Sequence, residues 1–316
     1  MRVILVGYGE MMRALALGIL NSKHDIVGVL RAETVKHNRL VRFINDYLKP
    51  SDDYIFIKTH SLPDINVNSV NSNKFRKIIK KLKADVVIVG SWSEKFSVHT
   101  LNTIPNGFVN VHPSLLPEYR GPNPYLQVIL HNESVSGITF HLMDVNYDTG
   151  AILYQKEVRV LRNDTGGSLR MRCCDTARNE IGFLLDNLHE RIIHQRSQNE
   201  LDSSYWAQVS LKDSIIDFEN ETPEEIARRI RALSPWLTCY IPIKGEFFSF
   251  RSYQITKNKL NQPPGTIVNK SGNTIFIVCK DFSVMKFSEL RIKRPFSKYL
   301  SKIFWEKIIN INDRAV

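Results

Sequence analysis

The first 150 residues alternate short β-branched runs with longer stretches of helical spacing, and this alternation constrains the fold more than any other feature. Runs such as Val86–Val89 are apolar without interruption, which is typical of strands buried on both faces. Strands that alternate with helices in this way form a parallel sheet covered by helices. The sequence therefore predicts an α/β fold with a Rossmann-like, mostly parallel sheet and helices on both faces.

The same periodicities predict the individual elements. Strands are expected at Arg2–Val6, Asp25–Leu30, Tyr54–Lys58, Asp85–Val89, Gly107–Val111 and Ile138–Met143. Helices are expected at Met11–Leu20, Lys36–Leu48, Asn71–Leu82 and Asp164–Leu188. Open sheets of this kind bind ligands beyond the carboxyl ends of their strands, so the residues that follow each strand are the candidates for chemistry.

The pattern changes in the last third of the chain. The polar stretch HQRSQNELDSS is typical of a linker, and Pro223–Ala232 is expected to be a helix with Thr222 as its N-cap. From Phe247 onward, short β-rich runs are separated by Gly, Pro and Asn, as in a small OB-like β-barrel. The expected organisation is a catalytic domain at 1–193, a linker at 194–206 and a C-terminal β-barrel domain at 207–316.

Composition excludes several classes of protein. No apolar run approaches the roughly 18 residues that a membrane span needs. The folded pattern begins at residue 2, so we expect no signal peptide and a cytoplasmic location. The four cysteines have no metal-ligand spacing and are expected to be buried thiols, with neither a disulfide framework nor a metal. They are Cys173, Cys174, Cys239 and Cys279.

The net charge of +11 is concentrated near the C-terminus. Between Arg251 and Val316, 13 Lys and Arg stand against 4 Asp and Glu. This surplus indicates either a solvated surface with a basic bias or a polyanionic partner. Nucleic acid is the favoured polyanion over a membrane, because no amphipathic basic helix stands out. Charge alone does not choose between these alternatives.

The most informative segment runs from Asn110 to Leu153. Asn110 and His112 lie two residues apart at the end of an apolar strand, so their side chains point to the same face. A proline-rich loop follows, and the next strand ends near two carboxylates, Asp144 and Asp148. Because an open α/β sheet places its site beyond the ends of its strands, these polar residues are the candidates for chemistry.

These residue types suit acyl transfer to an amine. A histidine can accept the proton that the attacking ammonium loses. The Asn110 amide or the imidazolium can stabilise the oxyanion, and losing one such donor typically raises the barrier by ~2.7–4 kcal/mol. A carboxylate, either Asp148 or Asp144, can orient the imidazole. Each residue alone is common in structural roles, but their order and spacing are specific.

The motif NVHPSLLPEYRG (110–121) and the turn Asp148-Thr149-Gly150 resemble those of the folate-dependent formyltransferase family. The chain is most similar to the members that formylate methionyl-tRNA, over residues 1 to about 290, and PPGTIVNK (263–270) resembles a strand of their barrel. The resemblance implies catalytic roles for Asn110, His112 and Asp148, with 10-formyltetrahydrofolate as the formyl donor. It implies reduced folate and initiator methionyl-tRNA as partners, and neither a membrane nor DNA.

The resemblance also implies where the two substrates bind. The pterin ring is expected in a cleft between the segment after the fourth predicted strand and the loop at 145–147. The residues expected to bind folate are Gly90, Ser91, Trp92, Phe96, Val145 and Tyr147. The loop after the Asn-x-His motif borders the acceptor pocket, so the residues expected to bind the amine acceptor are Arg120, Pro122, Asn123 and Tyr125.

Three segments depart from the family pattern. Gly7-Tyr8-Gly9 replaces Gly-Thr-Pro and resembles a degenerate dinucleotide turn, but we expect its glycines only to permit a tight bend. The segment 31–43 lacks the glycine- and lysine-rich loop that contacts tRNA, and Pro122–Tyr125 replaces Ala-Ala-Pro. The acceptor therefore stays open between methionyl-tRNA, which we favour, and an amino sugar or peptide amine. A 10-formyltetrahydrofolate hydrolase, a less favoured alternative, would use the same three catalytic residues.

Overall fold

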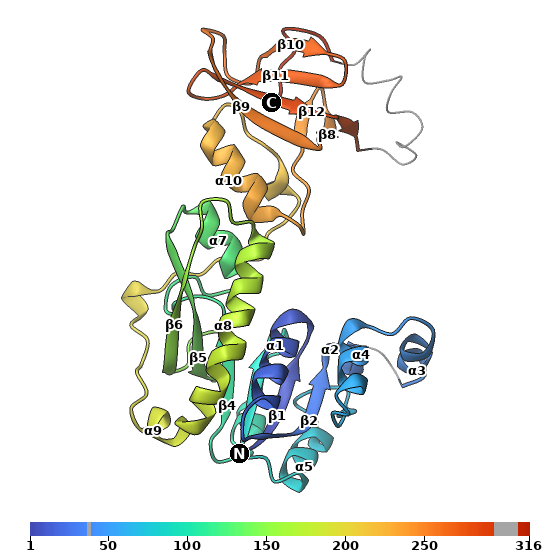
Figure 1. Cartoon of the computed structure of the whole chain (residues 1–316), viewed down its shortest axis with the longest axis vertical. Helices are drawn as coiled ribbons and strands as arrows, with labels where there is room; N and C mark the ends of the chain where they lie inside the picture. The colour runs from blue at the N-terminus through green and yellow to red at the C-terminus, as the bar shows by residue number, and fades with distance from the viewer. Residues whose placement is uncertain (37–38, 294–308) are drawn as a thin grey trace. The chain divides into compact units, whose positions relative to one another are not determined.

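The computed structural model describes residues 1–36, 39–293 and 309–316 (Figure 1). The chain forms two compact units. The first contains Met1–Val128, Ser134–Leu161 and Ser168–Ala207. The second contains Ile129–Glu133, Arg162–Gly167 and Gln208–Val316. The segment 194–206, which we expect to be a linker, packs within the first unit and includes a 3-10 turn, η1 (Glu200–Asp202).

The first unit is built on a six-stranded sheet in the order β2-β1-β3-β4-β5-β6. The strands are β1 (Arg2–Gly7), β2 (Asp25–Arg31), β3 (Val86–Gly90), β4 (Phe108–His112), β5 (Val135–Leu142) and β6 (Ile152–Arg159). The first four are parallel, whereas β5 pairs antiparallel with β4 and with β6. The predicted mostly parallel sheet is confirmed, and β6 adds an edge strand that was not predicted.

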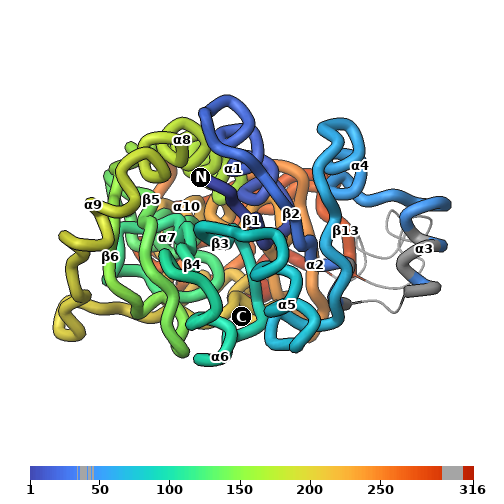
Figure 2. The backbone as a smooth tube through the Cα atoms, turned by 90° about the horizontal axis from the view of Figure 1, so that it is seen from below, coloured from blue at the N-terminus to red at the C-terminus, as the bar shows by residue number. Residues whose placement is uncertain are grey.

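Helices cover both faces of this sheet, as predicted (Figure 2). They are α1 (Gly9–Leu20), α2 (Ala32–Lys36), α3 (Arg39–Leu48), α4 (Asp52–Thr59), α5 (Asn73–Lys81), α6 (Val98–Leu101), α7 (Pro124–Leu130), α8 (Gly166–Asp186) and α9 (Leu188–Ile193). Figure 2 shows α1 and α8 on one side and α5 and α6 on the other. Alternate residues of β1 and β3, such as Ile4 and Val87, form one core cluster with Phe75 and Ile79 of α5. Full burial of each such side chain contributes about 1.5–3 kcal/mol.

One strand predicted in this unit was wrong. Tyr54–Lys58 was expected to be a strand but lies within helix α4, because Ser51 caps the helix by accepting a hydrogen bond from the backbone N–H of Tyr54. Two carboxylates in the first turn favour the same helix. The helix expected at Asp164–Leu188 is confirmed as α8, and the short helix α9 follows it.

The second unit is mainly antiparallel β-structure, as expected. Its helix α10 (Pro223–Leu233) starts with the predicted N-cap Thr222, which forms a capping box with Glu225. The other elements are η2 (Lys212–Ser214), β7 (Ile241–Ile243), β8 (Glu246–Ser249), β9 (Ser252–Lys259), β10 (Ile267–Ser271), β11 (Thr274–Val278), β12 (Ser283–Ser288) and β13 (Arg291–Ile292). They form a four-stranded sheet, β10-β11-β12-β9, and a three-stranded sheet, β13-β8-β7.

Candidate active site

Strand β4 brings Asn110 and His112 to the carboxyl edge of the parallel part of the sheet. The antiparallel neighbour β5 places His141 directly opposite Asn110 and Thr139 opposite His112. His112 is buried and Asn110 is half-buried. The pairing of β4 with β5 therefore gathers polar side chains from two strands at one end of the sheet.

Asp148 completes this group from the turn between β5 and β6. Its Oδ1 lies 3.3 Å from Nδ1 of His112, and its Oδ2 accepts a hydrogen bond from the backbone N–H of Gly121 at 3.0 Å. The backbone of Asp148 is left-handed, with a φ of 59°, a conformation that Asp adopts more readily than most residues. Gly150 is required two residues later, since a Cβ there would lie 1.7 Å from the carbonyl oxygen of Leu142. The structure thus brings together all three predicted catalytic residues.

Asp144, the other carboxylate predicted as a candidate to orient the imidazole, instead forms hydrogen bonds within its own loop. It accepts hydrogen bonds from the hydroxyl of Thr149 and from the backbone N–H of Asn146. These contacts stabilise the loop that carries Asp148. Of the two carboxylates, only Asp148 forms an ion pair with His112.

The pKa values of His112 and Asp148 are shifted in opposite directions. Burial alone would lower the pKa of His112 and raise that of Asp148. The charge and hydrogen bond of the partner outweigh burial in both cases: the pKa of His112 is raised, and the pKa of Asp148 is held well below its usual range. The partner's charge therefore favours the charged form of each side chain.

A backbone carbonyl determines which nitrogen of His112 can exchange a proton. Nε2 lies 2.9 Å from the carbonyl oxygen of Tyr119. Because a carbonyl oxygen only accepts, Nε2 must carry a hydrogen. Nδ1, which faces Asp148, is therefore the position of His112 that gains and loses a proton.

His141 is a site residue that sequence analysis missed. Its Nδ1 donates to the carbonyl oxygen of Leu142 at 2.8 Å, so its Nε2 is free to accept from Nδ2 of Asn110 at 3.1 Å. Burial lowers the pKa of His141 to about 4, which keeps the ring neutral. His141 therefore orients the amide of Asn110. Its alternation with Thr139 on β5 is visible in the sequence, but the register that places it against Asn110 is not.

A pocket opens beside these residues. It is lined by Val89, Trp92, Glu94, Lys95, Phe96, Asn110, His141, Met143, Asp144, Val145, Asn146, Tyr147 and Asp148. Four of the residues predicted to bind folate are among them: Trp92, Phe96, Val145 and Tyr147. The other two, Gly90 and Ser91, lie at and just beyond the end of β3, next to the pocket segment but not among its lining residues.

The lining of this pocket suits an aromatic heterocycle. The indole N–H of Trp92 is buried and has no hydrogen-bond partner in the structure. Leaving such a donor unpaired costs about 1–3 kcal/mol, and a ligand acceptor would satisfy it. Across the pocket, the hydroxyl of Tyr147 donates to the carbonyl oxygen of Ser93 at 2.7 Å, and the ammonium of Lys95 lies 4.9 Å from the Tyr147 ring centroid. The two segments expected to enclose the pterin therefore touch each other.

The residues predicted to bind the acceptor have different surroundings. Arg120 is buried, and its three guanidinium nitrogens all donate within the protein, to Gln198 and Glu200. Burial raises the pKa of Tyr125 to about 12, and its hydroxyl donates a long hydrogen bond to Oδ1 of Asn123. Nδ2 of Asn123 is buried without a partner. The fourth predicted residue, Pro122, is exposed.

The turn Gly7-Tyr8-Gly9 packs against other groups of the protein. A Cβ on Gly7 would lie 2.1 Å from the carbonyl oxygen of Gly90, which explains the glycine that sequence analysis attributed to a tight bend. The buried carboxylate of Asp53 accepts from the backbone N–H of Gly9 at 2.8 Å and pairs with Arg13. A carboxylate thus takes the position at the start of α1 where a dinucleotide phosphate would bind.

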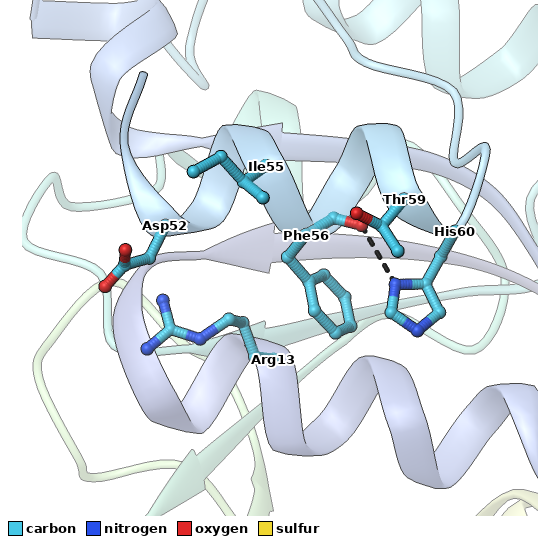
Figure 3. A pocket seen from close by; sticks show the side chains of 6 residues that line it. All are labelled: Arg13, Asp52, Ile55, Phe56, Thr59 and His60. Carbon is cyan, nitrogen blue, oxygen red and sulfur yellow. Dashed lines mark hydrogen bonds between the residues drawn. The ribbon is translucent and has the colours of Figure 1, made fainter. Parts of the chain in front are cut away.

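Figure 3 shows the neighbouring hollow between α1 and α4. The guanidinium of Arg13 extends towards Asp52, and the ring centroids of Phe56 and His60 lie 4.2 Å apart. A second hollow is lined by four acidic residues, Glu10, Glu33, Asp52 and Asp53, and by Arg13, Tyr8, Gly9, Ala32 and Ser51. This surplus of carboxylates disfavours an anionic ligand beside Gly9.

The segment 31–43, which lacks the family's glycine- and lysine-rich loop, begins with a buried arginine. Arg31 is fully buried, and its guanidinium binds the carboxylates of Asp46 and Asp64 and stacks over Tyr54. Helices α2 and α3 follow it in place of the single predicted helix. Arg31 therefore anchors α3 to the sheet and is not part of a nucleic-acid surface.

Two further observations concern the described residues as a whole. They contain no group of three or more His, Cys, Asp or Glu that could hold a metal ion, and all four cysteines are free and buried. None of the helices in the same residues is both long and apolar enough to cross a membrane.

Comparison with known families gives two matches. Residues 2–182 match the family model described as formyl transferase, and residues 208–297 match the model described as formyl transferase, C-terminal domain. A methionyl-tRNA formyltransferase of Alkaliphilus metalliredigens is 28% identical over 277 residues, which is 88% of this chain and 86% of that protein. A methionyl-tRNA formyltransferase of Clostridium beijerinckii is 32% identical over 64% of this chain and 65% of its own length.

Two solved structures have the same fold. An N-formyltransferase of Helicobacter canadensis, in complex with folinic acid and dTDP-3-aminofucose, has a TM-score of 0.66 and is 17% identical, covering 91% of this chain and 99% of its own. A sugar 3N-formyl transferase in the presence of dTDP and 5-N-formyl-THF has a TM-score of 0.65 at 17% identity, covering 94% and 99%. At these identities the likeness extends to the fold alone.

Proposed function

The chain belongs to the formyl transferase family, and we propose that it transfers the formyl group of 10-formyltetrahydrofolate to the amine of methionyl-tRNA. It is a folate-dependent formyltransferase, with 10-formyltetrahydrofolate as the donor substrate. The observation that carries the catalytic assignment is the His112–Asp148 ion pair beside Asn110, where Asn110 and Asp148 both line the pocket.

The proposed mechanism starts with the proton of the acceptor ammonium. Nδ1 of His112 accepts this proton, and the carboxylate of Asp148 beside it stabilises the imidazolium that forms. The freed amine attacks the formyl carbon, and a tetrahedral oxyanion forms. Asn110 donates to the oxyanion through the N–H that otherwise makes a long, 3.4 Å contact with Asp148. The attacking nitrogen then releases its second proton to solvent, and His112 gives the first proton to the departing folate nitrogen as the bond from this nitrogen to the formyl carbon breaks.

In this mechanism the folate donor lies in the pocket lined by Trp92, Phe96, Val145 and Tyr147. The aromatic rings supply apolar contact with the pterin, and the unpaired indole N–H of Trp92 supplies a donor. Gly90 and Ser91 contribute through the backbone of the segment that carries Trp92.

Methionyl-tRNA is the favoured acceptor because the similarity to methionyl-tRNA formyltransferases extends over 88% of the chain, into the C-terminal unit. An amino sugar or peptide amine is the second candidate. The observations that favour it are the acceptor loop Pro122–Tyr125 and the carboxylate-lined hollow beside Gly9, which would repel a polyanion. The buried Nδ2 of Asn123 provides an unpaired donor in that loop for either acceptor.

The test follows folate release from 10-formyltetrahydrofolate with methionyl-tRNA, with a panel of amino-sugar nucleotides, with a peptide amine and with no acceptor. Release that requires methionyl-tRNA supports the proposal, and release that requires a small amine supports the second candidate. Release without any acceptor would indicate a hydrolase. Asp148→Asn is the control for contaminating activity, because it removes the carboxylate and keeps the shape of the side chain.

A further inference from the structure

We propose that Gln198, in the segment expected to be only a linker, is a positioning residue that holds Asp148 against His112. The inference rests on the proposed function, since it concerns the same proton-transfer pair. It concerns residues of the first unit alone. No feature of the sequence around Gln198 predicts such a task.

The side-chain amide of Gln198 bridges two parts of the site. Its Nε2 donates to the carbonyl oxygens of Asp148 at 2.9 Å and Gly150 at 2.8 Å. Its Oε1 accepts from Nη2 of Arg120 at 2.7 Å and from Nε of Arg120 at 3.2 Å. Both N–H bonds and the carbonyl oxygen of this amide are therefore used, and each contact has a specific direction.

Arg120 continues this bridge to the carboxylate of Asp148. It is the chain neighbour of Gly121, whose backbone N–H donates to Oδ2 of Asp148. The backbone of Arg120 is itself fixed on both sides, because its N–H donates to the carbonyl oxygen of Ser204 at 2.8 Å and its carbonyl oxygen accepts from the N–H of Trp206 at 3.0 Å. The segment 194–206 thus holds Asp148 at its backbone through Gln198 and at its carboxylate through the Arg120–Gly121 backbone.

The position of Asp148 needs such support because its backbone is left-handed and because the ion pair depends on distance. Oδ1 lies 3.3 Å from Nδ1 of His112, and a shift of the turn lengthens this contact. The charged and titratable groups that face His112 are Asp148, neutral His141 and, at longer range, Arg120. Only Asp148 raises the pKa of the imidazole among these three, so its displacement lowers that pKa.

The test compares Gln198→Glu with wild type. The introduced carboxylate would still accept from Arg120, but its oxygens would replace both amide donors and repel the carbonyls of Asp148 and Gly150. We expect turnover to fall on the order of 10- to 100-fold, as a displacement near 1 Å can cause, with the KM for folate changed less than about twofold. In Gln198→Met, which removes both donors without adding a charge, the acid limb of the pH profile should move to lower pH, which a merely structural role would not cause.

Arg196→Ala is the matched control. Arg196 lies two residues away, donates through its side chain to Gln155 at 3.0 Å and pairs with Ile152 through its backbone, which the substitution leaves intact. We expect wild-type turnover and an unshifted acid limb from this variant. Gln198→Met, similar in length and without hydrogen-bonding groups, is the second test variant in case the glutamate prevents folding.

The titration of the His112 ring, followed by NMR in the absence of substrates, separates this inference from the proposed function. A lowered His112 pKa in Gln198→Met, which adds no charge, supports the inference even if no amine is formylated. A folded variant with wild-type turnover, an unshifted acid limb and an unchanged His112 titration would overturn it. Failure of the wild type to release folate with every acceptor would instead overturn the proposed function.

Discussion

At the scale of single residues, the raised pKa of His112 determines how activity depends on pH. Because the mechanism needs Nδ1 to be unprotonated before the amine attacks, activity falls as the pH drops through this raised pKa. We expect the acid limb of kcat/KM to lie above about 6.5, the ordinary value for histidine. The position of this limb is measured by a pH–rate profile, recorded with the acceptor that supports folate release.

Asp148→Asn provides the comparison for this limb. Without the carboxylate, burial becomes the main influence and lowers the pKa of His112, so the residual activity should have its acid limb at lower pH. Turnover should fall at least ~100-fold, because proton acceptance and electrostatic stabilisation are lost together. If the acid limb of the wild-type pH profile lay at or below the ordinary pKa of histidine, this would contradict the proposed role of the His112–Asp148 pair.

His141 leads to a second prediction at this scale. Replacing it with Phe removes the acceptor that orients the Asn110 amide, so turnover should fall about 3- to 10-fold, the value of one net hydrogen bond. His141→Gln retains an acceptor and should restore most of the activity. Since His141 is neutral above about pH 4, neither variant should shift the acid limb. Equal turnover in the Phe and Gln variants would show that the hydrogen bond to Asn110 does not matter.

At the scale of elements, the sequence predicted the strands of the catalytic edge well and the segment 31–64 poorly. The Asn-x-His strand and the Asp-Thr-Gly turn are local signals, and both lie where they were expected. Tyr54–Lys58 has the composition of a strand, but the N-cap Ser51 and the acidic first turn stabilise a helix there. Contacts between distant segments, such as Asn110 with His141 or Asp148 with Gln198, depend on pairing register and chain path, which local patterns do not contain.

Helix α4 also supports helix α1, so removing the contact between them should lower the free energy of unfolding. Asp53→Ala removes the acceptor for the N–H of Gly9 and leaves Arg13 without its buried carboxylate. The loss of a cap and of a charged hydrogen bond should lower the free energy of unfolding by about 2–4 kcal/mol, measured by urea denaturation. Asp52→Ala is the control: Asp52 is exposed in the first turn of α4 and should cost at most about 1 kcal/mol. Equal costs for the two variants would show that Asp53 does not cap α1.

At the scale of the whole molecule, the C-terminal unit raises the question of the acceptor. It matches the C-terminal domain of the formyl transferase family and carries most of the surplus positive charge. Part of this charge, including Arg294, Lys298 and Lys302, lies outside the described residues. Lys293 is described, and its ammonium lies 4.6 Å from the ring centroid of Tyr240. A tRNA would contact such a basic unit through many phosphates, whereas an amino-sugar nucleotide or a peptide amine offers few or none.

This difference predicts how salt affects the reaction. If methionyl-tRNA is the acceptor, raising the salt from about 50 to about 200 mM should lower its kcat/KM at least ~10-fold, because each phosphate contact releases counterions. Lys257, exposed on β9, tests the C-terminal unit directly: Lys257→Glu should lower kcat/KM for tRNA and flatten the salt dependence. Lys80→Glu, the same charge change on α5 of the first unit, should have a smaller effect. A kcat/KM for methionyl-tRNA that does not change with salt would argue against phosphate recognition. It would favour a small amine as the acceptor, selected by the carboxylate-lined hollow beside Gly9.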